Sequence, residues 1–139
     1  MLNAIMHVIA EENLFDAQYV DTFTEGWEAF RAHLKDYPPE RMAEFCGVDA
    51  ESLRQVARVF ATSSASMIFW GMGISQHIHG TDNARCLISL ALMCGHVGRP
   101  GTGLHPLRGQ NNVQGASDAG LIPMFLPDYQ SVTDENVRA

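Results

Sequence analysis

The sequence predicts a mixed α/β fold, because helical periodicity near its start gives way to a strand–glycine–helix pattern further along. Apolar residues recur at helical spacing over residues 2–12 and again after Asp49. The apolar run 66–70 is short and continuous, as in a strand buried on both faces of a parallel sheet. We therefore predict a partial Rossmann-like domain with α/β/α layers, a parallel sheet and a helix-rich amino-terminal half.

The amino-terminal half is expected to contain several short helices with recognisable ends. Asp16 and Thr24 are plausible N-caps. Pro39 suits the first turn of a helix, and Gly47 suits the residue after one. The expected spans are 2–12, 16–23, 24–34 and 39–45, followed by a helix that Asp49 caps. The side chains expected in the core are Trp27, Phe30, Phe45, Leu53, Val56, Ala57 and Phe60.

The next part of the chain predicts half of a βαβ unit. The strand leads directly into Gly71-Met-Gly-Ile-Ser-Gln76, and a helix is expected over residues 81–96, capped by Thr81 or Asp82. Gly98 is expected to end that helix. Its buried residues should be Leu87, Ile88, Leu90, Ala91 and Leu92. Beyond Gly98 we expect loops, a short helical turn within 117–124 and a frayed polar tail over 131–139.

Gly71-x-Gly73 stands where open parallel sheets bind ligands, at the carboxyl end of a strand. Glycines there let the backbone approach a ligand closely, and backbone N–H groups can receive phosphate oxygens. Gln76 replaces the third glycine of GxGxxG, and no acidic residue follows at the distance of an ordinary NAD fingerprint. The alternative is a simple tight turn.

The run Arg108-Gly-Gln-Asn-Asn-Val-Gln-Gly-Ala-Ser-Asp118 is rich in hydrogen-bonding side chains and has almost nothing to bury, so we expect a loop that binds a large polar ligand. A guanidinium presents a fixed fork of donors that suits a carboxylate, although Arg108 could also be an ordinary surface residue. The net charge of −7 argues against nucleic acid as a partner. The segment 63–126 is nevertheless neutral to positive, with Asp82 and Asp118 against Arg85, Arg99 and Arg108.

Other site classes have little support. The three cysteines have no CxxC spacing and are expected to be free thiols in a reducing cytoplasm. His77, His79 and His105 could bind a metal, but no ligand set completes them, so we expect surface or structural roles. No apolar run is long enough for a membrane span, and no signal peptide is recognisable.

Three segments resemble a known family: Phe69-Trp-Gly-Met-Gly-Ile-Ser-Gln76, Cys94-Gly-His-Val-Gly-Arg-Pro-Gly-Thr-Gly103 and His105-Pro-Leu-Arg-Gly-Gln-Asn-Asn-Val-Gln-Gly-Ala-Ser-Asp118. They resemble the catalytic (alpha) subunit of molybdenum-dependent formate dehydrogenases, in the molybdopterin oxidoreductase superfamily. The sequence Gly-Met-Gly-Ile-Ser-Gln-His, residues 71–77, most resembles the cytoplasmic, NAD-linked branch of this family.

The resemblance implies a reversible oxidation of formate to CO2 at a molybdenum or tungsten ion on a bis-molybdopterin guanine dinucleotide. It places Gly71, Met72, Gly73 and Gln76 along one dinucleotide, and Gly109 and Gln110 close to the pterin. Arg108 matches the active-site arginine, which is thought to orient formate and stabilise charge.

The resemblance also implies that this chain is an internal fragment. The family's metal-binding Cys or selenocysteine, its 4Fe-4S cysteine cluster and its carboxyl-terminal domain have no counterpart here, so the isolated chain is expected to be inactive. Residues 1–107 should belong to the dinucleotide-binding α/β domain, and 108–139 to the active-site loop and the start of the next cofactor domain. Electron-transfer subunits would supply the NAD link. The alternatives are a stand-alone pterin- or partner-binding module and a sister enzyme with another substrate, such as nitrate.

Overall fold

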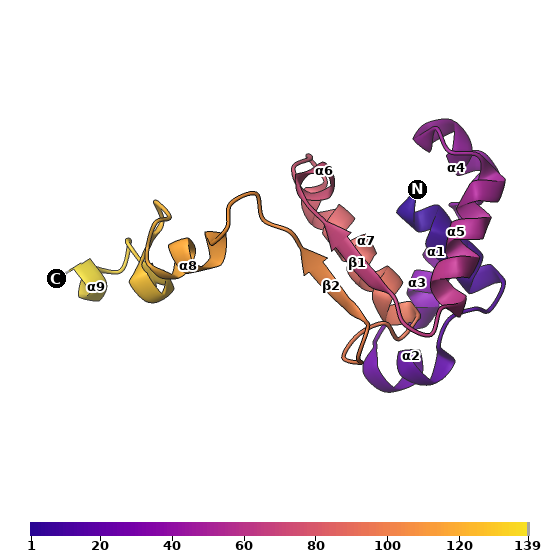
Figure 1. Ribbon diagram of the computed structural model, residues 1–139, viewed down its shortest axis with the longest axis horizontal. Coiled ribbons are helices and arrows are strands. Elements are labelled where there is room, and N and C mark those ends of the chain that lie inside the picture. The colour runs from indigo at the N-terminus through magenta and orange to yellow at the C-terminus, as the bar shows by residue number, and fades with distance from the viewer. Residues whose placement is uncertain (139) are drawn as a thin grey trace. The chain divides into compact units, whose positions relative to one another are not determined.

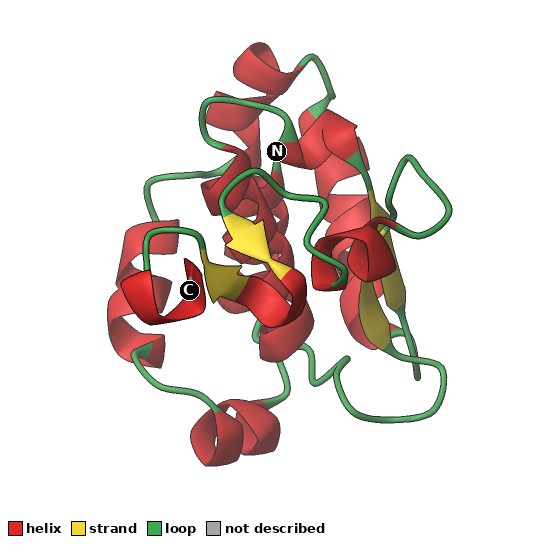
Figure 2. Cartoon of the chain, turned by 90° about the vertical axis from the view of Figure 1, so that its left-hand side faces the viewer, coloured by secondary structure: helices red, strands yellow, loops and turns green. Residues whose placement is uncertain are grey.

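The computed structural model describes residues 1–138, except for the side chain of residue 138. The chain divides into two compact units, Met1–His105 and Pro106–Ala139 (Figure 1). Helices dominate and the strands are short (Figure 2). The elements of the first unit are α1 Leu2–Glu11, α2 Ala17–Phe23, α3 Trp27–Leu34, α4 Pro39–Cys46, α5 Ala50–Thr62, β1 Met67–Trp70, α6 Met72–Ser75, α7 Gly80–Met93 and β2 Gly103–Pro106. The second unit has α8 Val113–Asp118, β3 Phe125–Leu126, the 3-10 helix η1 Pro127–Tyr129, β4 Gln130–Ser131 and α9 Glu135–Arg138.

Helix α1 is the centre of the first unit. It packs against α3, α4, α5 and α7, and its sequence is apolar on most sides. A helix that is apolar nearly all round is stable in water only when neighbours cover it. The fully buried residues of this core include Met6, Ile9, Leu34 and Leu53.

The predicted helix caps are confirmed at Asp16, Asp49 and Gly47. The Asp16 carboxylate accepts the N–H of Tyr19 at 2.9 Å, and Asp49 accepts the N–H of Ser52 at 2.9 Å. Gly47 ends α4 in the left-handed region, at φ 67°. Each of these residues acts within its own turn of helix, which explains why the local sequence pattern was enough to predict the cap.

Thr24 is not an N-cap, so that prediction was wrong. Its hydroxyl donates to the Val20 carbonyl at 2.6 Å, which places it at the end of α2. Gly26 precedes α3 instead, with φ 75°. A glycine pays little strain at positive φ, so the chain turns there and α3 starts three residues later than expected.

The core prediction holds for most apolar residues and fails for three. Trp27, Phe30 and Phe60 pack against the buried cluster, as expected, while Phe45 is 73% exposed and Val56 is 53% exposed. Ile88 of α7 is also exposed. Helical spacing places these three on faces that no other described element covers.

Strands β1 and β2 form a small parallel sheet, which confirms the α/β class (Figure 1). Burial of β1 on both faces is not observed: Ile68 packs against the core, but Met67 and Phe69 are exposed. The described residues cover only one face of this sheet. Strand β2 was not predicted, because Gly103 and Pro106 at its ends are typical of turns.

Helix α7 ends at Met93, three residues before the predicted end, because Gly95 takes up φ 62°.

The second unit also differs from expectation. The polar run is not all loop, since Asn112 caps α8 by accepting the N–H of Gly115 at 3.1 Å. β3 and β4 then pair antiparallel, with Phe125 opposite Ser131.

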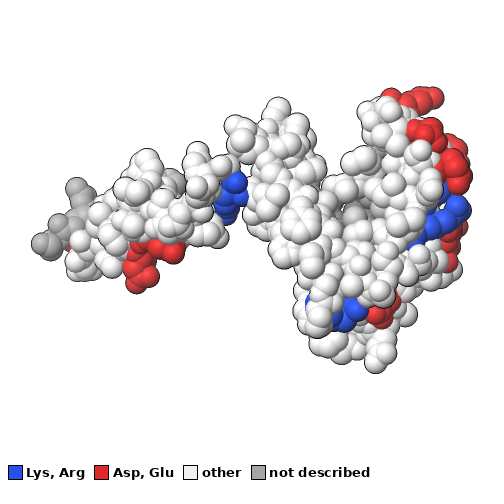
Figure 3. Space-filling view, viewed as in Figure 1, with Lys and Arg blue, Asp and Glu red and all other residues white. Residues whose placement is uncertain are grey.

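Acidic side chains gather over α4 and α5, with basic side chains among them (Figure 3). Arg54 pairs with Glu40, and Arg58 with Glu12 at 2.7 Å. The hydrogen bonds from Arg58 lower the pKa of Glu12. These pairs tie α5 to α4 and to the end of α1, and their exposure limits what each adds to stability.

None of the helices over residues 1–138 is both long and apolar enough to cross a membrane.

The three cysteines are free thiols of unequal accessibility. Burial, with the nearby Asp16 carboxylate as a smaller cause, raises the pKa of Cys94 to about 12. Because the thiolate is the reactive form, we expect Cys94 to resist alkylation at pH 8 in the folded protein and to react in denaturant. Peptide mass spectrometry after iodoacetamide treatment measures this, with the half-buried Cys46 as the internal comparison. Equal labelling of both thiols in the folded state would contradict the burial of Cys94.

Candidate functional site

One candidate site, in the first unit, is the loop after β1, which turns into helix α6. The Gly71 carbonyl accepts the N–H of Ile74 at 3.1 Å and both the N–H and the hydroxyl of Ser75, at 3.3 and 3.2 Å. The ring of His77 donates to the Gly73 carbonyl at 2.8 Å. The predicted glycine loop is therefore one tight helical turn rather than an open loop.

The start of α7 holds this turn in place. The Asn83 amide donates to the Ile74 carbonyl at 3.0 Å, and the N–H of Gly80 donates to the His77 carbonyl at 3.0 Å. Gly80 is buried, and a Cβ there would overlap the carbonyl oxygen of Ser75. Neither Asn83 nor Gly80 was predicted as a site residue. The only sequence signal was that Gly80 directly precedes the helical pattern.

The outer surface of the turn is open. Met72 is 62% exposed, and Gly73 and Gln76 are exposed as well. No heavy atom lies within 4 Å of the position a Cβ would take on Gly73. Among the hydrogen bonds of residues 1–138, none uses the backbone N–H of Thr81 or Asp82. These two donors at the start of a helix of 14 residues suit an anionic group.

A second candidate site, described by itself, is the polar run of the second unit. Arg108 is exposed, and its Nη2 donates to Oε1 of Gln114 at 3.1 Å. Gln114 belongs to α8, whose first turn Asn112 caps. Within residues 1–138 no carboxylate forms an ion pair with Arg108. The guanidinium is thus hydrogen-bonded to a neutral amide, and its positive charge is available to an anion.

The structure groups the predicted site residues in two sets. Gly71, Met72, Gly73 and Gln76 come together at α6 in the first unit. Arg108, Gly109 and Gln110 lie together in the second unit, and Gly109 and Gln110 are both exposed. Gln114, the partner of Arg108, was not predicted, because an amide six residues away gives no periodic signal.

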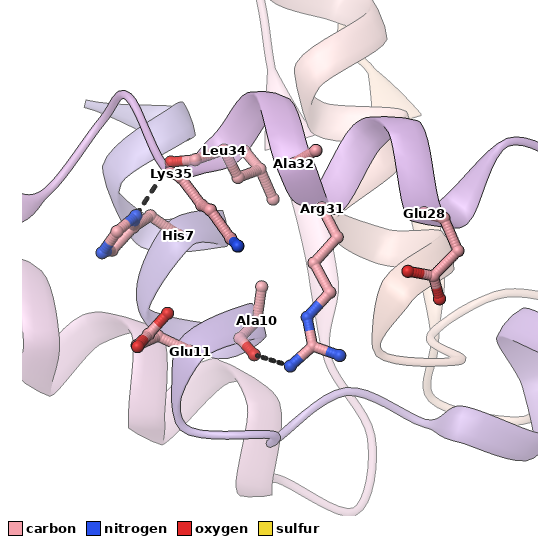
Figure 4. A pocket seen from close by; sticks show the side chains of 8 residues that line it. All are labelled: His7, Ala10, Glu11, Glu28, Arg31, Ala32, Leu34 and Lys35. Atoms are coloured by element: carbon pink, nitrogen blue, oxygen red, sulfur yellow. Dashed lines mark hydrogen bonds between the residues drawn. The ribbon is translucent and has the colours of Figure 1, made fainter.

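A pocket of about 380 Å³ lies elsewhere, between α1 and α3 (Figure 4). The His7 ring donates to the Leu34 carbonyl at 2.8 Å, and Arg31 donates to the Ala10 carbonyl at 3.4 Å. The side chains of Glu11, Glu28 and Lys35 complete its charged wall. The carboxylates of Glu11 and Glu28 are balanced by the cations of Arg31 and Lys35. The net charge of the pocket therefore favours neither an anionic nor a cationic ligand.

Histidines do not form a metal centre with the groups around them. His79 Nδ1 lies 3.7 Å from Asp82, and His77 is already bonded to Gly73. Over residues 1–138 no three His, Cys, Asp or Glu side chains gather closely enough to hold a metal ion.

The molybdopterin oxidoreductase family model matches residues 1–138. The chain belongs to the molybdopterin oxidoreductase family. Formate dehydrogenase H of Escherichia coli K12 is 46% identical over 134 residues, which are 96% of this chain and 19% of that protein. The F420-dependent formate dehydrogenase subunit alpha of Methanocaldococcus jannaschii is 42% identical over 134 residues, again 96% of this chain and 20% of that protein. The chain therefore spans about a fifth of the length of these molybdopterin oxidoreductases.

Two further proteins that this chain resembles have other names. A nitrate reductase of Synechocystis is 33% identical over 138 residues, which cover 99% of this chain and 19% of that protein. Among solved structures, acetylene hydratase from Pelobacter acetylenicus matches with a TM-score of 0.67 and 27% identity, over 72% of this chain and 14% of that one. The similarity supports the fold, and family membership implies a molybdenum or tungsten pterin cofactor. Because these similar proteins are named for different reactions, similarity of fold does not determine which reaction this chain takes part in.

Proposed function

We propose that this chain is part of the catalytic subunit of a formate dehydrogenase, which oxidises formate to CO2 and runs the reverse reaction. The observation that carries the proposal is the charge on Arg108, which no carboxylate of residues 1–138 neutralises and which Gln114 holds in an exposed position. Formate is a small carboxylate, and a guanidinium can bind it through two parallel hydrogen bonds. The identity of 46% to a formate dehydrogenase supports the same substrate.

The cofactor proposed is a molybdenum or tungsten bis-molybdopterin guanine dinucleotide. The turn at α6 fits part of it, since Gly73 offers an open backbone surface and the N–H groups of Thr81 and Asp82 suit phosphate oxygens. Gly71, Met72 and Gln76 would complete that contact, with Gly109 and Gln110 near the pterin. When bound, the group takes up the two electrons released by formate. We propose no metal ligand from this chain.

In the reaction, formate becomes CO2, one proton and two electrons. Arg108 would bind the two oxygens and turn the C–H bond toward the cofactor, and its charge would stabilise the carboxylate while that bond breaks. Gln114 would fix the guanidinium, because its Oε1 already accepts one of the N–H groups. The other donors of the guanidinium are then free for the substrate.

Electron transfer from this site would pass through an iron–sulfur centre outside the chain to partner subunits. We propose NAD as the final acceptor and the cytoplasm as the location, on the resemblance of residues 71–77. Two relatives are F420-dependent by name. Assays of the full-length enzyme with NAD and with F420 distinguish these acceptors.

The test of the substrate is turnover by the full-length enzyme with formate, nitrate and other small anions, using an artificial dye as the electron carrier. We expect dye reduction with formate alone. Reduction of nitrate without oxidation of formate would reject the proposal in favour of a sister enzyme, which the nitrate reductase relative makes the natural second candidate.

The placement of the cofactor predicts the effect of Gly73→Ala. A Cβ at this position meets no protein atom within 4 Å and φ is not in the left-handed region, so folding should be unaffected. The methyl group would occupy the surface along which the dinucleotide lies, so the purified enzyme should contain at least about tenfold less bound cofactor, the scale of roughly 1.4 kcal/mol. Metal content per polypeptide and the thermal midpoint of the cofactor-free protein measure the two effects separately. A full metal content in this variant would remove Gly73 from the proposed contact.

A further inference from the structure

The segment between α7 and β2 contains a buried histidine that the proposed function does not use. His96 is 1% exposed and is the one buried polar side chain among residues 1–137. Its Nε2 lies 3.0 Å from the Phe60 carbonyl, and its Nδ1 lies 3.3 Å from Nη2 of Arg99. A guanidinium can only donate and a carbonyl can only accept. Nδ1 is therefore the acceptor, and Nε2 holds the proton that bonds Phe60.

Arg99 joins two turns that are far apart in the sequence. Its Nη1 donates to the Ser64 carbonyl at 3.0 Å, and its Nε donates to the Gly95 carbonyl at 3.0 Å. Ser64 lies in the turn that leads into β1, and Gly95 lies at the start of the turn that leads into β2. One side chain thus connects the segments from which the two strands begin.

The turn that carries Arg99 is closed by its own hydrogen bonds and packs against the turn before β1. The Thr102 hydroxyl donates to the Arg99 carbonyl at 2.8 Å and accepts the N–H of Arg99 at 3.2 Å. The position of a Cβ on Gly101 would be 3.1 Å from the Cβ of Ala65. The backbone that holds the guanidinium is therefore fixed on both sides, which lowers the entropy that Arg99 loses when it makes its three side-chain bonds.

The strands need such support. β1 and β2 have four residues each, they run parallel, and no third strand pairs with them among residues 1–138. A short two-stranded sheet is marginally stable, and a slip of one residue would exchange the faces of Leu104 and His105. In the observed register His105 stacks on Phe69, with ring centroids 4.8 Å apart.

We propose that Arg99, acting through His96, is a positioning residue that sets the register of β1 against β2. The carboxyl end of β1 leads into the turn at Gly73, and β2 ends at Pro106, two residues before Arg108. A correct register at the start of the strands therefore fixes the backbone that leads into the turn at Gly73 and the backbone that leads toward Arg108. The catalytic consequence rests on the proposed function, while the structural consequence does not.

The test is hydrogen exchange on the full-length holoenzyme, combined with formate kinetics. In Arg99→Met, which keeps an unbranched side chain and removes every side-chain donor, amides of β1 and β2 should exchange roughly tenfold faster or more. Amides of α1 should be unchanged. kcat should fall by about tenfold with a smaller change in KM, since misplaced groups affect the reacting geometry first. Arg99→Lys should recover part of both effects, because an ammonium can bond one or two of the three acceptors.

Arg41→Met is the matched control. Arg41 is an exposed arginine whose one hydrogen bond goes to the Asp36 carbonyl at 3.1 Å, and we expect wild-type exchange and turnover. Wild-type exchange of β1 and β2 in Arg99→Met would overturn the proposal, and so would an equal rise in α1. If Arg99→Met does not fold, His96→Leu, which has no polar atom on its side chain, removes the acceptor for Arg99 and must show the same selective exchange. Selective exchange in an enzyme that does not oxidise formate would leave the positioning role intact and reject the proposed function alone.

Discussion

Replacing Arg108 with alanine in the full-length enzyme is expected to lower formate turnover by about 100-fold or more, the scale of losing one transition-state donor. Arg108 is exposed and bonded to the neutral Gln114, so its removal leaves no unpaired carboxylate behind and should not disturb folding. The loss should therefore appear in kcat/KM, with the thermal midpoint unchanged. Steady-state kinetics with formate and an artificial dye measure it.

Arg108→Lys separates charge from geometry in the same experiment. An ammonium keeps the positive charge but lacks the planar fork, so turnover should lie between those of wild type and the alanine variant. Arg41→Ala, which removes another exposed arginine, should behave as wild type. Unchanged formate kinetics in Arg108→Ala would remove this residue from the mechanism.

The sequence was most informative where structure depends on residue type. The run that follows Arg108 has almost nothing to bury, and that property alone predicted a polar surface segment, while its binding role stays a prediction. Pattern reasoning could not show that Asn112 caps a short helix inside it, or that Gln114 of that helix bonds Arg108. The Asn112 cap and the Arg108–Gln114 hydrogen bond both depend on how the backbone folds back over these residues, and amino-acid composition does not specify that path.

In the fold, too, features set by local residue type were predicted, and features set by the path of the chain were not. Asp16 and Asp49 were predicted as caps because a cap bonds a residue three positions away. Thr24 has the right residue type for a cap, yet it ends α2, because Gly26 offers the chain a left-handed turn two residues later. Val56 has the right spacing for the core, but no described element covers its side of α5. The predictions failed where a residue outside the helical turn itself, such as Gly26, or the absence of a covering element, as beside Val56, determined the structure.

Gly80→Ala is expected to destabilise the turn at α6 more than any other glycine substitution in that loop. A Cβ on Gly80 would overlap the Ser75 carbonyl, which is backbone and cannot rotate away. Forcing an added methyl group into a packed site costs about 1–3 kcal/mol, and more where backbone must move. We expect a lower thermal midpoint and a loss of bound cofactor together, measured by calorimetry and by metal content. Gly80→Ala with wild-type stability would contradict the close packing of α6 on α7.

The contrast with Gly73→Ala is the informative part of that experiment. Gly73 and Gly80 lie in the same connection between β1 and α7, but only Gly80 contacts another backbone segment. Gly80→Ala should therefore lose stability in the cofactor-free protein, and Gly73→Ala should lose cofactor without losing stability. The glycine pattern after a strand led to the prediction that Gly73 faces a ligand. It gave no sign that Gly80 packs the turn, because that close packing depends on the path of the chain five residues earlier.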